Sequence, residues 1–336
     1  MNESQPRIPV GLCIYGIAYT AGYVGAGTSR ANATPLAPNG FLDLAAQLGL
    51  TSVEMDFGFI SRQEELSALL AFRERADELG LQIVSAGPGI DAAAFAHHLP
   101  LAAKMGVKVV RCCISGVLCG DRRPLGGLEG WQRHLAVTAE QLRQIAPLAE
   151  QLGIHIGVEN HQDATSDDLL WLCGEVDSAN VGITLDTGNP LAVAEDPIQF
   201  AERILPRLVH VHLKDYRMVR SDAGYRLFHC PIGAGVVDFA ALRKVCASKP
   251  EVLFHIEMAA LGERHIRILE DDYWEGHSPR QVRSVLPILR RLRNCESDVD
   301  WRTPWETGDE ANLVGWEMQR LRESVGNMRR LFDVTY

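Results

Sequence analysis

The stretch Ile156-Gly157-Val158-Glu159-Asn160-His161 is a short apolar run that ends in a carboxylate, an amide and an imidazole. Three later runs repeat this form, and each ends in residue types that bind metals: Ile183-Thr184-Leu185-Asp186, Val209-His210-Val211-His212 and Leu253-Phe254-His255-Ile256-Glu257. Their β-branched and apolar composition predicts strands, and helical segments separate them. We expect the last side chains of these strands to meet at one end of a barrel.

The same alternation of strand and helix extends over most of the chain. Glycines close several helical segments, and a strand follows each of them. The expected strands lie at 9–15, 51–57, 81–86, 107–115, 155–160, 181–186, 208–213 and 251–257. Eight strands, each followed by a helix, predict a (β/α)8 TIM barrel. An open doubly wound sheet would need a Gly-x-Gly-x-x-Gly turn after the first strand, and Gly25-Ala26-Gly27 lacks its third glycine.

Two expected loops and a tail complete this organisation. The glycine-rich loop at 16–38 is too long for a plain connector, so we expect a lid or a substrate contact there. A second long loop is expected at 214–237. Residues 310–331 predict one long helix. We therefore divide the chain into a barrel at 1–297 and a C-terminal helical extension at 298–336, which either packs on the barrel or forms an oligomer contact.

Composition narrows the function classes. The chain has 336 residues, 46% hydrophobic and 23% charged, which is typical of a soluble protein. A net charge of -10 disfavours binding to nucleic acid. The polar N-terminus predicts no signal peptide, and no apolar run is long enough to span a bilayer. We expect a cytoplasmic protein that binds neither nucleic acid nor membranes and keeps its cysteines reduced.

The four strand-end residues Glu159, Asp186, His212 and Glu257, named the quartet below, predict a metal site. Alternation along a strand gives each of them an inward position. Three carboxylates around one imidazole would repel one another or take up protons, and a divalent cation removes this cost. The ligands suit one Mn²⁺ best, with Mg²⁺, Co²⁺ or Zn²⁺ as alternatives. No cysteine ends these four strands, which excludes a thiolate-rich site.

These stretches resemble the xylose isomerase-like TIM barrel superfamily of sugar isomerases and epimerases. The similar pieces keep the family's order: Val158-Glu159-Asn160, Thr184-Leu185-Asp186-Thr187-Gly188-Asn189, His210-Val211-His212-Leu213-Lys214-Asp215, Gly233-Ala234-Gly235-Val236-Val237-Asp238-Phe239 and His255-Ile256-Glu257. In the first half the resemblance is chiefly Ser52-Val53-Glu54-Met55. It implies one metal held by the quartet. It also implies that Glu159 and Glu257 flank the substrate and exchange a proton with carbon.

The superfamily also contains DNA-repair endonucleases that use three metals, and this chain departs from their pattern. Those enzymes carry a His three residues after the strand-six Asp, where this chain has Asn189. They carry an Asp-x-His before the following Gly-x-Gly, where this chain has Leu227-Phe228-His229. A three-metal cluster would therefore lack ligands, and we expect one metal and a small substrate.

The expected activity is that of a metal-dependent isomerase or epimerase, which abstracts a proton next to the carbonyl of a keto-sugar or polyol. The alternative is a lyase that eliminates a substituent, similar to C-glycoside deglycosidases or inosose dehydratases. An endonuclease and a non-catalytic barrel rank below these. The expected partners are a sugar or sugar conjugate and further copies of the chain. The chain is similar in length to the large subunit of the deglycosidases, so a small second subunit is a further alternative.

Further side chains are candidates for catalysis and substrate binding. His161 lies two residues past Glu159 and faces the same pocket, as a base, as an acid for a leaving group, or as a hydrogen-bonding partner. The candidate substrate contacts are Glu54, Lys214 and His229. Four arginines could also reach substrate oxygens, with surface salt bridges as the alternative: Arg30, Arg111, Arg217 and Arg264. His97 and His98 are expected on a helix surface.

Overall fold

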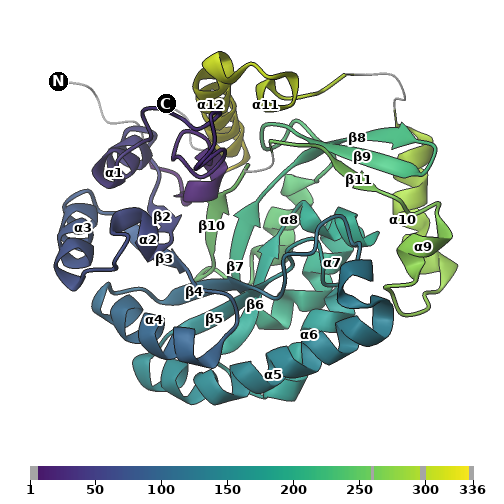
Figure 1. The fold of residues 1–336 in the computed structure, drawn as a ribbon, viewed down its shortest axis with the longest axis horizontal. Coiled ribbons are helices and arrows are strands. Elements are labelled where there is room, and N and C mark those ends of the chain that lie inside the picture. The colour runs from purple at the N-terminus through teal and green to yellow at the C-terminus, as the bar shows by residue number, and fades with distance from the viewer. Residues whose placement is uncertain (1–6, 259–260, 296–299, 333–336) are drawn as a thin grey trace.

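The computed structural model describes residues 7–258, 261–295 and 300–332. Its centre is a closed barrel of parallel strands in the order β1-β10-β7-β6-β5-β4-β3-β2 (Figure 1). These strands are β1 (Gly11–Cys13), β2 (Ser52–Met55), β3 (Gln82–Ala86), β4 (Val109–Cys113), β5 (His155–Glu159), β6 (Val181–Asp186), β7 (Leu208–Leu213) and β10 (Leu253–Ile256). The TIM barrel predicted from the sequence is thus confirmed, and every expected strand range contains one of its strands.

Helices form a ring around the strands in Figure 1. Their apolar faces join the barrel's core because residues three or four apart lie on one side of a helix, as Leu142, Ile145 and Ala149 do. The longer helices are α1 (Pro38–Gln47), α3 (Leu66–Glu78), α4 (Ala92–Lys104), α5 (Gly127–Leu152), α6 (Ser166–Val176), α7 (Pro197–Ile204), α8 (Phe239–Cys246), α10 (Val282–Arg293) and α12 (Leu313–Leu331). The short ones are η1 (Ile14–Ile17), α2 (Phe57–Ile60), η2 (Arg123–Leu125), η3 (Asn189–Val193), η4 (Leu205–Arg207), α9 (Asp271–Trp274), α11 (Pro304–Thr307) and η5 (Glu310–Asn312).

The segment expected as a long loop at 214–237 contains regular structure, so that prediction was wrong. It holds a hairpin of β8 (Tyr216–Ser221) and β9 (Gly224–His229), and β11 (Arg264–Ile266) adds a third antiparallel strand. One face of this sheet buries a separate apolar cluster against η3, α9 and α10. This burial explains why the hairpin is stable, since a two-stranded hairpin alone is marginal in water.

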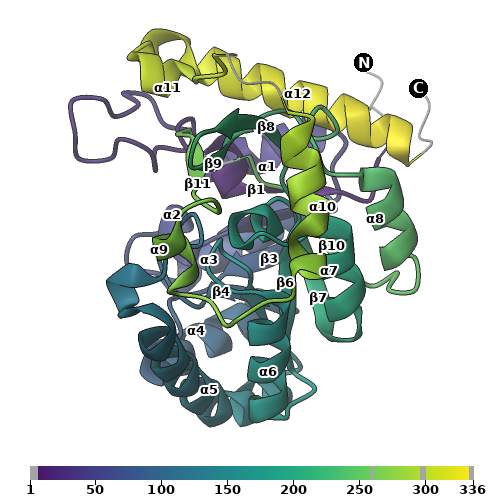
Figure 2. The same ribbon diagram turned by 90° about the vertical axis from the view of Figure 1, so that its right-hand side faces the viewer.

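The C-terminal helix α12 packs on the barrel and also contacts the loop at 16–38. Leu321, Val325 and Met328 belong to the same buried core as the strands. The buried carboxylate of Glu317 accepts hydrogen bonds from the backbone N–H of Tyr19 at 3.0 Å and from the backbone N–H of Thr20 at 2.7 Å. Figure 2 shows the helix along one edge of the molecule, above β1 and β8. The division predicted at residue 297 lies outside the described residues.

The pair His97 and His98 on α4 divides between surface and core. His97 is exposed, as expected, but His98 is buried, so the surface prediction for His98 was wrong. Its ring stacks on Phe57 with ring centres 4.4 Å apart, and Nε2 lies 2.9 Å from the hydroxyl of Ser85.

Among the described residues, no helix combines the length and the apolar character needed to cross a membrane.

Candidate active site

The structure brings the quartet together at the C-terminal ends of neighbouring strands. Glu159 ends β5, Asp186 ends β6, His212 lies near the end of β7, and Glu257 follows β10. Strand register sets Asp186 level with His212, while Glu159 pairs with Thr184, two residues before Asp186. Glu257 lies two residues beyond His255, the partner of His212 on β10. All four side chains are buried, and one ligand atom from each lies within 4.8 Å of the others.

The polar atoms at the centre of the quartet fit a divalent cation. Glu159 Oε1, His212 Nδ1 and Glu257 Oε2 are buried, and no described group forms a hydrogen bond with any of them. His212 Nδ1 nevertheless lies 2.8 Å from Glu257 Oε2 and 3.6 Å from Glu159 Oε1. Unpaired buried polar atoms are costly, and a cation that takes all three as ligands would satisfy them. Carboxylate oxygens and an imidazole nitrogen are suitable ligands for such an ion.

Glu54 lies behind His212 on β2 and is fully buried. Its Oε2 is 2.6 Å from His212 Nε2, so this nitrogen donates and Nδ1 is left with its lone pair toward the quartet. Its Oε1 accepts a hydrogen bond from Arg111 Nε at 3.1 Å. Both oxygens thus face protein groups. We expected Glu54 to touch the substrate, and these contacts instead suit a residue that orients a metal ligand.

Two buried cations balance the carboxylates. Arg111 Nε lies 3.4 Å from Glu159 Oε2, and Lys214 Nζ pairs with Asp186 and lies 3.3 Å from Glu257 Oε1. Burial alone would raise the pKa of Glu159, but Arg111 and His212 lower it to about 2. Burial disfavours the Lys214 ammonium, but the neighbouring Asp186 and Glu257 hold its pKa well above the usual range. Lys214 therefore contacts two carboxylates of the quartet, and its ammonium has a third N–H to donate.

Sequence reasoning passed over Cys113 and gave Arg111 no part in supporting the metal ligands. Residues 111 and 113 alternate inward on β4, and Cys113 pairs in register with Glu159. The alternation rule that selected the quartet would have selected both of them. The Cys113 thiol lies 3.4 Å from Glu159 Oε2, and Cys13 is grouped with Glu54 and His212. Burial raises the pKa of both thiols well above their usual value.

Further polar side chains border the quartet. His161 Nδ1 is buried and has no hydrogen-bonding partner among the described residues. Both polar side-chain atoms of Asn189 are also buried and also lack such a partner there. The ring of His229 meets Tyr216 edge-on, with ring centres 4.7 Å apart. Gln162 Nε2 lies 3.5 Å from the Tyr216 hydroxyl, which connects the loop after β5 to the small sheet.

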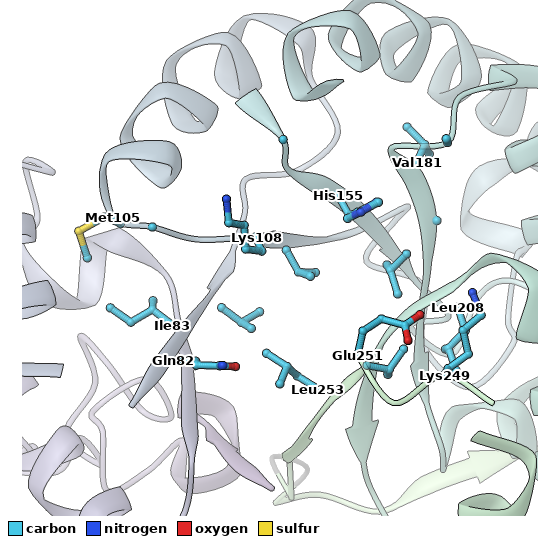
Figure 3. Close-up of a pocket in the computed structure, with 18 of the residues that line it drawn as sticks. Gln82, Ile83, Met105, Lys108, His155, Val181, Leu208, Lys249, Glu251 and Leu253 are labelled. Carbon is cyan, nitrogen blue, oxygen red and sulfur yellow. The ribbon is translucent and has the colours of Figure 1, made fainter. Parts of the chain in front are cut away.

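A cavity of about 820 Å³ lies at the opposite end of the barrel. Residues at the N-terminal ends of β3 to β7 and of β10 line it, including Lys108, His155 and Glu251 (Figure 3). No residue that the sequence nominates for the site is among its lining residues.

Known proteins share this architecture. A curated relative, 3-oxo-isoapionate decarboxylase from Pectobacterium atrosepticum, is 27% identical over 226 residues, covering 65% of this chain and 77% of that protein. Inosose dehydratase from Bacillus thuringiensis is 30% identical over 134 residues, which are 37% of this chain and 44% of the dehydratase, so this match spans less than half of that relative. The solved structure of a D-psicose 3-epimerase in the presence of D-fructose superposes with a TM-score of 0.57 at 18% identity, covering 88% of this chain and 93% of the epimerase.

The profile of one protein family matches residues 42–263, a range that includes every barrel strand except β1 and every member of the quartet. With the closed barrel and the ligand set at its C-terminal end, this match identifies the chain as a member of the xylose isomerase-like TIM barrel family.

Proposed function

We propose that this protein is a divalent-metal-dependent enzyme that abstracts a proton from the carbon next to the carbonyl of a keto-sugar or polyol, and so isomerises or epimerises it. The observation that carries the proposal is the buried quartet, whose ligand atoms lie within 4.8 Å of one another and include three without a hydrogen bond from a described group. Gathering three carboxylates around one buried imidazole costs desolvation energy, and a shared divalent cation would offset that cost. Mn²⁺ is the ion that we expect, and the metal roles of the four residues remain part of the proposal.

A bound ion would polarise the substrate carbonyl and stabilise the negative charge that develops on its oxygen. The protein's own groups would move the proton. Glu159 and Glu257 each have one oxygen held by a cation, Arg111 or Lys214, and a second oxygen without a hydrogen bond from any described group. Each carboxylate is therefore fixed in orientation and still has an oxygen available for a metal or a proton.

The supporting residues would keep this geometry rigid. Glu54 fixes the tautomer of His212, and Asn160 joins two strand ends by accepting from the Asp186 N–H at 2.6 Å and donating to its carbonyl at 2.9 Å. His161, Lys214 and His229 are proposed to bind the substrate's hydroxyl and carbonyl oxygens. A leaving group next to His161 would give that residue a part in elimination.

A lyase is the second candidate, and specific relatives favour it. The curated relatives named above are a decarboxylase and a dehydratase, and both names denote the loss of a group from the substrate. The likeness to the epimerase rests on a structure at 18% identity and concerns the fold alone. Both reactions need a carbonyl oxygen that accepts negative charge, so the same quartet could serve either of them.

The direct test is hydrogen exchange in heavy water. Manganese-loaded protein is incubated with a set of keto-sugars, and deuterium at the carbon next to the carbonyl is followed by NMR. We expect exchange with at least one bound sugar, faster than any net conversion. Binding without exchange for every sugar would contradict proton abstraction. If the substrate instead loses water or carbon dioxide in the same experiment, the lyase reaction is supported in place of isomerisation or epimerisation.

A further inference from the structure

We propose that Arg264 binds an anionic group of the substrate, so that the substrate is a keto-sugar that carries a carboxylate. This inference rests on the proposed function, because it assigns a substrate class to the same site. It begins from the small sheet of β8, β9 and β11, which the sequence did not predict.

Strand register places Arg264 on the face of this sheet that carries the apolar cluster, and the Tyr216 end of that face approaches the end of β6. Arg264 pairs with Leu227, and His229 lies two residues further along β9, so these side chains share one face. Tyr216 pairs with His229 and shares that face too. A Cβ added to Gly188, two residues past Asp186, would lie 2.6 Å from the Tyr216 ring, which shows how closely the face approaches the end of β6.

Electrostatic effects agree with this placement. Burial lowers the pKa of His229, and the nearby charges of Lys214 and Arg264 lower it further. His229 therefore feels the charges of both Lys214 and Arg264.

Arg264 has no anionic partner within the described parts of the chain. Its Nη1 reaches only two carbonyl oxygens of its own loop, Gly262 at 3.2 Å and Glu263 at 3.4 Å. Its Nε is buried and makes no hydrogen bond to a described group. A half-buried guanidinium with an unsatisfied donor is costly unless a ligand completes it.

The other cations considered from the sequence are engaged elsewhere. Arg111 and Lys214 contact quartet carboxylates. Arg30 pairs with Glu310, and Arg217 lies on the opposite face of β8, with its guanidinium 3.7 Å from the centre of the Trp301 ring. Arg264 alone of these five combines a position on the face that approaches the site with the lack of an anionic or aromatic partner among the described residues.

The charge balance of the site indicates a single negative charge on the ligand. A divalent cation, if bound, would together with Arg111 and Lys214 neutralise the buried carboxylates of Glu54 and the three acidic quartet members. Arg264 then adds one uncompensated positive charge, which a carboxylate would neutralise. A phosphate dianion would bring more charge and more acceptor oxygens than this one guanidinium can satisfy.

A carboxylate bound in this way would serve as an anchor and would remain in the product. Ion pairing with a guanidinium stabilises the carboxylate, and decarboxylation would have to destroy that interaction. The inference therefore predicts that the acid group stays on the sugar while chemistry occurs at the carbonyl.

The test uses matched ligands that differ only in this charge. Fructose, psicose, tagatose and sorbose are each compared with the analogue in which C6 is a carboxylate, by calorimetry on manganese-loaded protein and on metal-free protein. We expect at least one acid to bind about tenfold or more tightly than its parent sugar. Arg264→Met should remove this preference without weakening the parent sugar, and Arg264→Lys should keep part of it. Arg226→Met, on the neighbouring strand and already paired with Glu263, should leave the preference unchanged.

Three outcomes would overturn the inference: no acid binds more tightly than its parent, the preference survives Arg264→Met, or the 6-phosphates show the Arg264-dependent preference in place of the carboxylates. Failure of the proposed function is separable, because it appears as absence of metal binding or deuterium exchange. The charge preference is read from binding alone, including binding to metal-free protein.

Discussion

The two ends of the barrel differ in what their strands present. At the C-terminal end, the quartet and its supporting cations are buried and contact one another within hydrogen-bonding or ion-pair distances. At the N-terminal end, a cavity of about 820 Å³ is open, and ionisable side chains on its wall, Lys108, His155 and Glu251, are exposed (Figure 3). This cavity is therefore not where buried charged groups gather.

This difference indicates that a cluster of buried ionisable groups is a better guide to the proposed site than an open cavity is. Desolvated charges cost several kcal/mol each unless they serve a ligand or a partner, whereas exposed charges cost little. Barrel enzymes place their chemistry at the C-terminal end because the loops that follow the strands can shape a pocket there. Matched substitutions at the two ends test whether they differ in function as they do in burial, and substitutions elsewhere test the energetics of burial by itself.

The largest effect is expected from a matched pair of histidine substitutions. His212→Asn removes a proposed metal ligand and should lower the deuterium-exchange rate by about 10³-fold or more, since metal polarisation is worth several kcal/mol. His155→Asn, on the wall of the opposite cavity, should leave the rate within about twofold. Equal losses in the two variants would mean that the ends of the barrel do not differ as we propose.

A buried histidine outside both ends tests burial by itself. Burial lowers the pKa of His98 to about 4, so the unfolded chain, with a histidine pKa near 6.5, binds the extra proton first as the pH falls. Stability should thus be complete above about pH 6.5 and fall by about 3 kcal/mol toward pH 4. Urea titrations of His98→Gln should show a shallower pH slope in that window, and the exposed His97→Gln should behave like the parent. A parallel slope for His98→Gln would refute this assignment.

Glu54 separates support of a ligand from direct contact with substrate. Glu54→Gln removes the charge behind His212 and should weaken manganese binding by about 10- to 100-fold, as loss of such partners typically does. Calorimetry with manganese provides the measurement, and circular dichroism checks that the variant folds. The same substitution at Glu251 should not change the affinity. If Glu54→Gln alters only the KM for the sugar, the substrate-contact role expected from the sequence would be restored.

The smallest effect concerns the attachment of α12 to the loop at 16–38. Glu317→Gln replaces one of the two acceptor oxygens that bind the backbone N–H groups of Tyr19 and Thr20. We expect it to lower the free energy of unfolding by about 1–2 kcal/mol. Chemical denaturation provides the measurement. Glu323→Gln on an exposed face of the same helix should cost less than about 0.5 kcal/mol. Equal costs would show that the contact does not stabilise the loop.

The barrel strands and the quartet could be predicted because both follow local rules. Period-two alternation selects the inward residues, and the helix–glycine–strand pattern counts the units. The small sheet was missed because arginines at 217, 220 and 226 make its strands resemble a polar loop, and because β11 pairs with β9 from far along the chain. Its turn at Asp222 and Ala223, followed by Gly224, was the available signal.

The supporting contacts could not be predicted for a different reason. Glu54 meets His212 only because the barrel closes, with β1 between β2 and β10, and no local pattern encodes that closure. His97 and His98 were both assigned to a helix surface, but burial of His98 depends on Phe57 from another element. Long-range packing decides such cases, and the sequence pattern records it only indirectly.

The most direct test of the central claim is the metal content of the protein purified without chelator, measured by elemental analysis against protein concentration. We predict about one divalent ion per chain, lost in parallel in His212→Asn and Asp186→Asn while both variants stay folded. Fully folded parent protein that neither contains nor binds manganese, magnesium, cobalt or zinc would contradict the proposal that the quartet is a metal site.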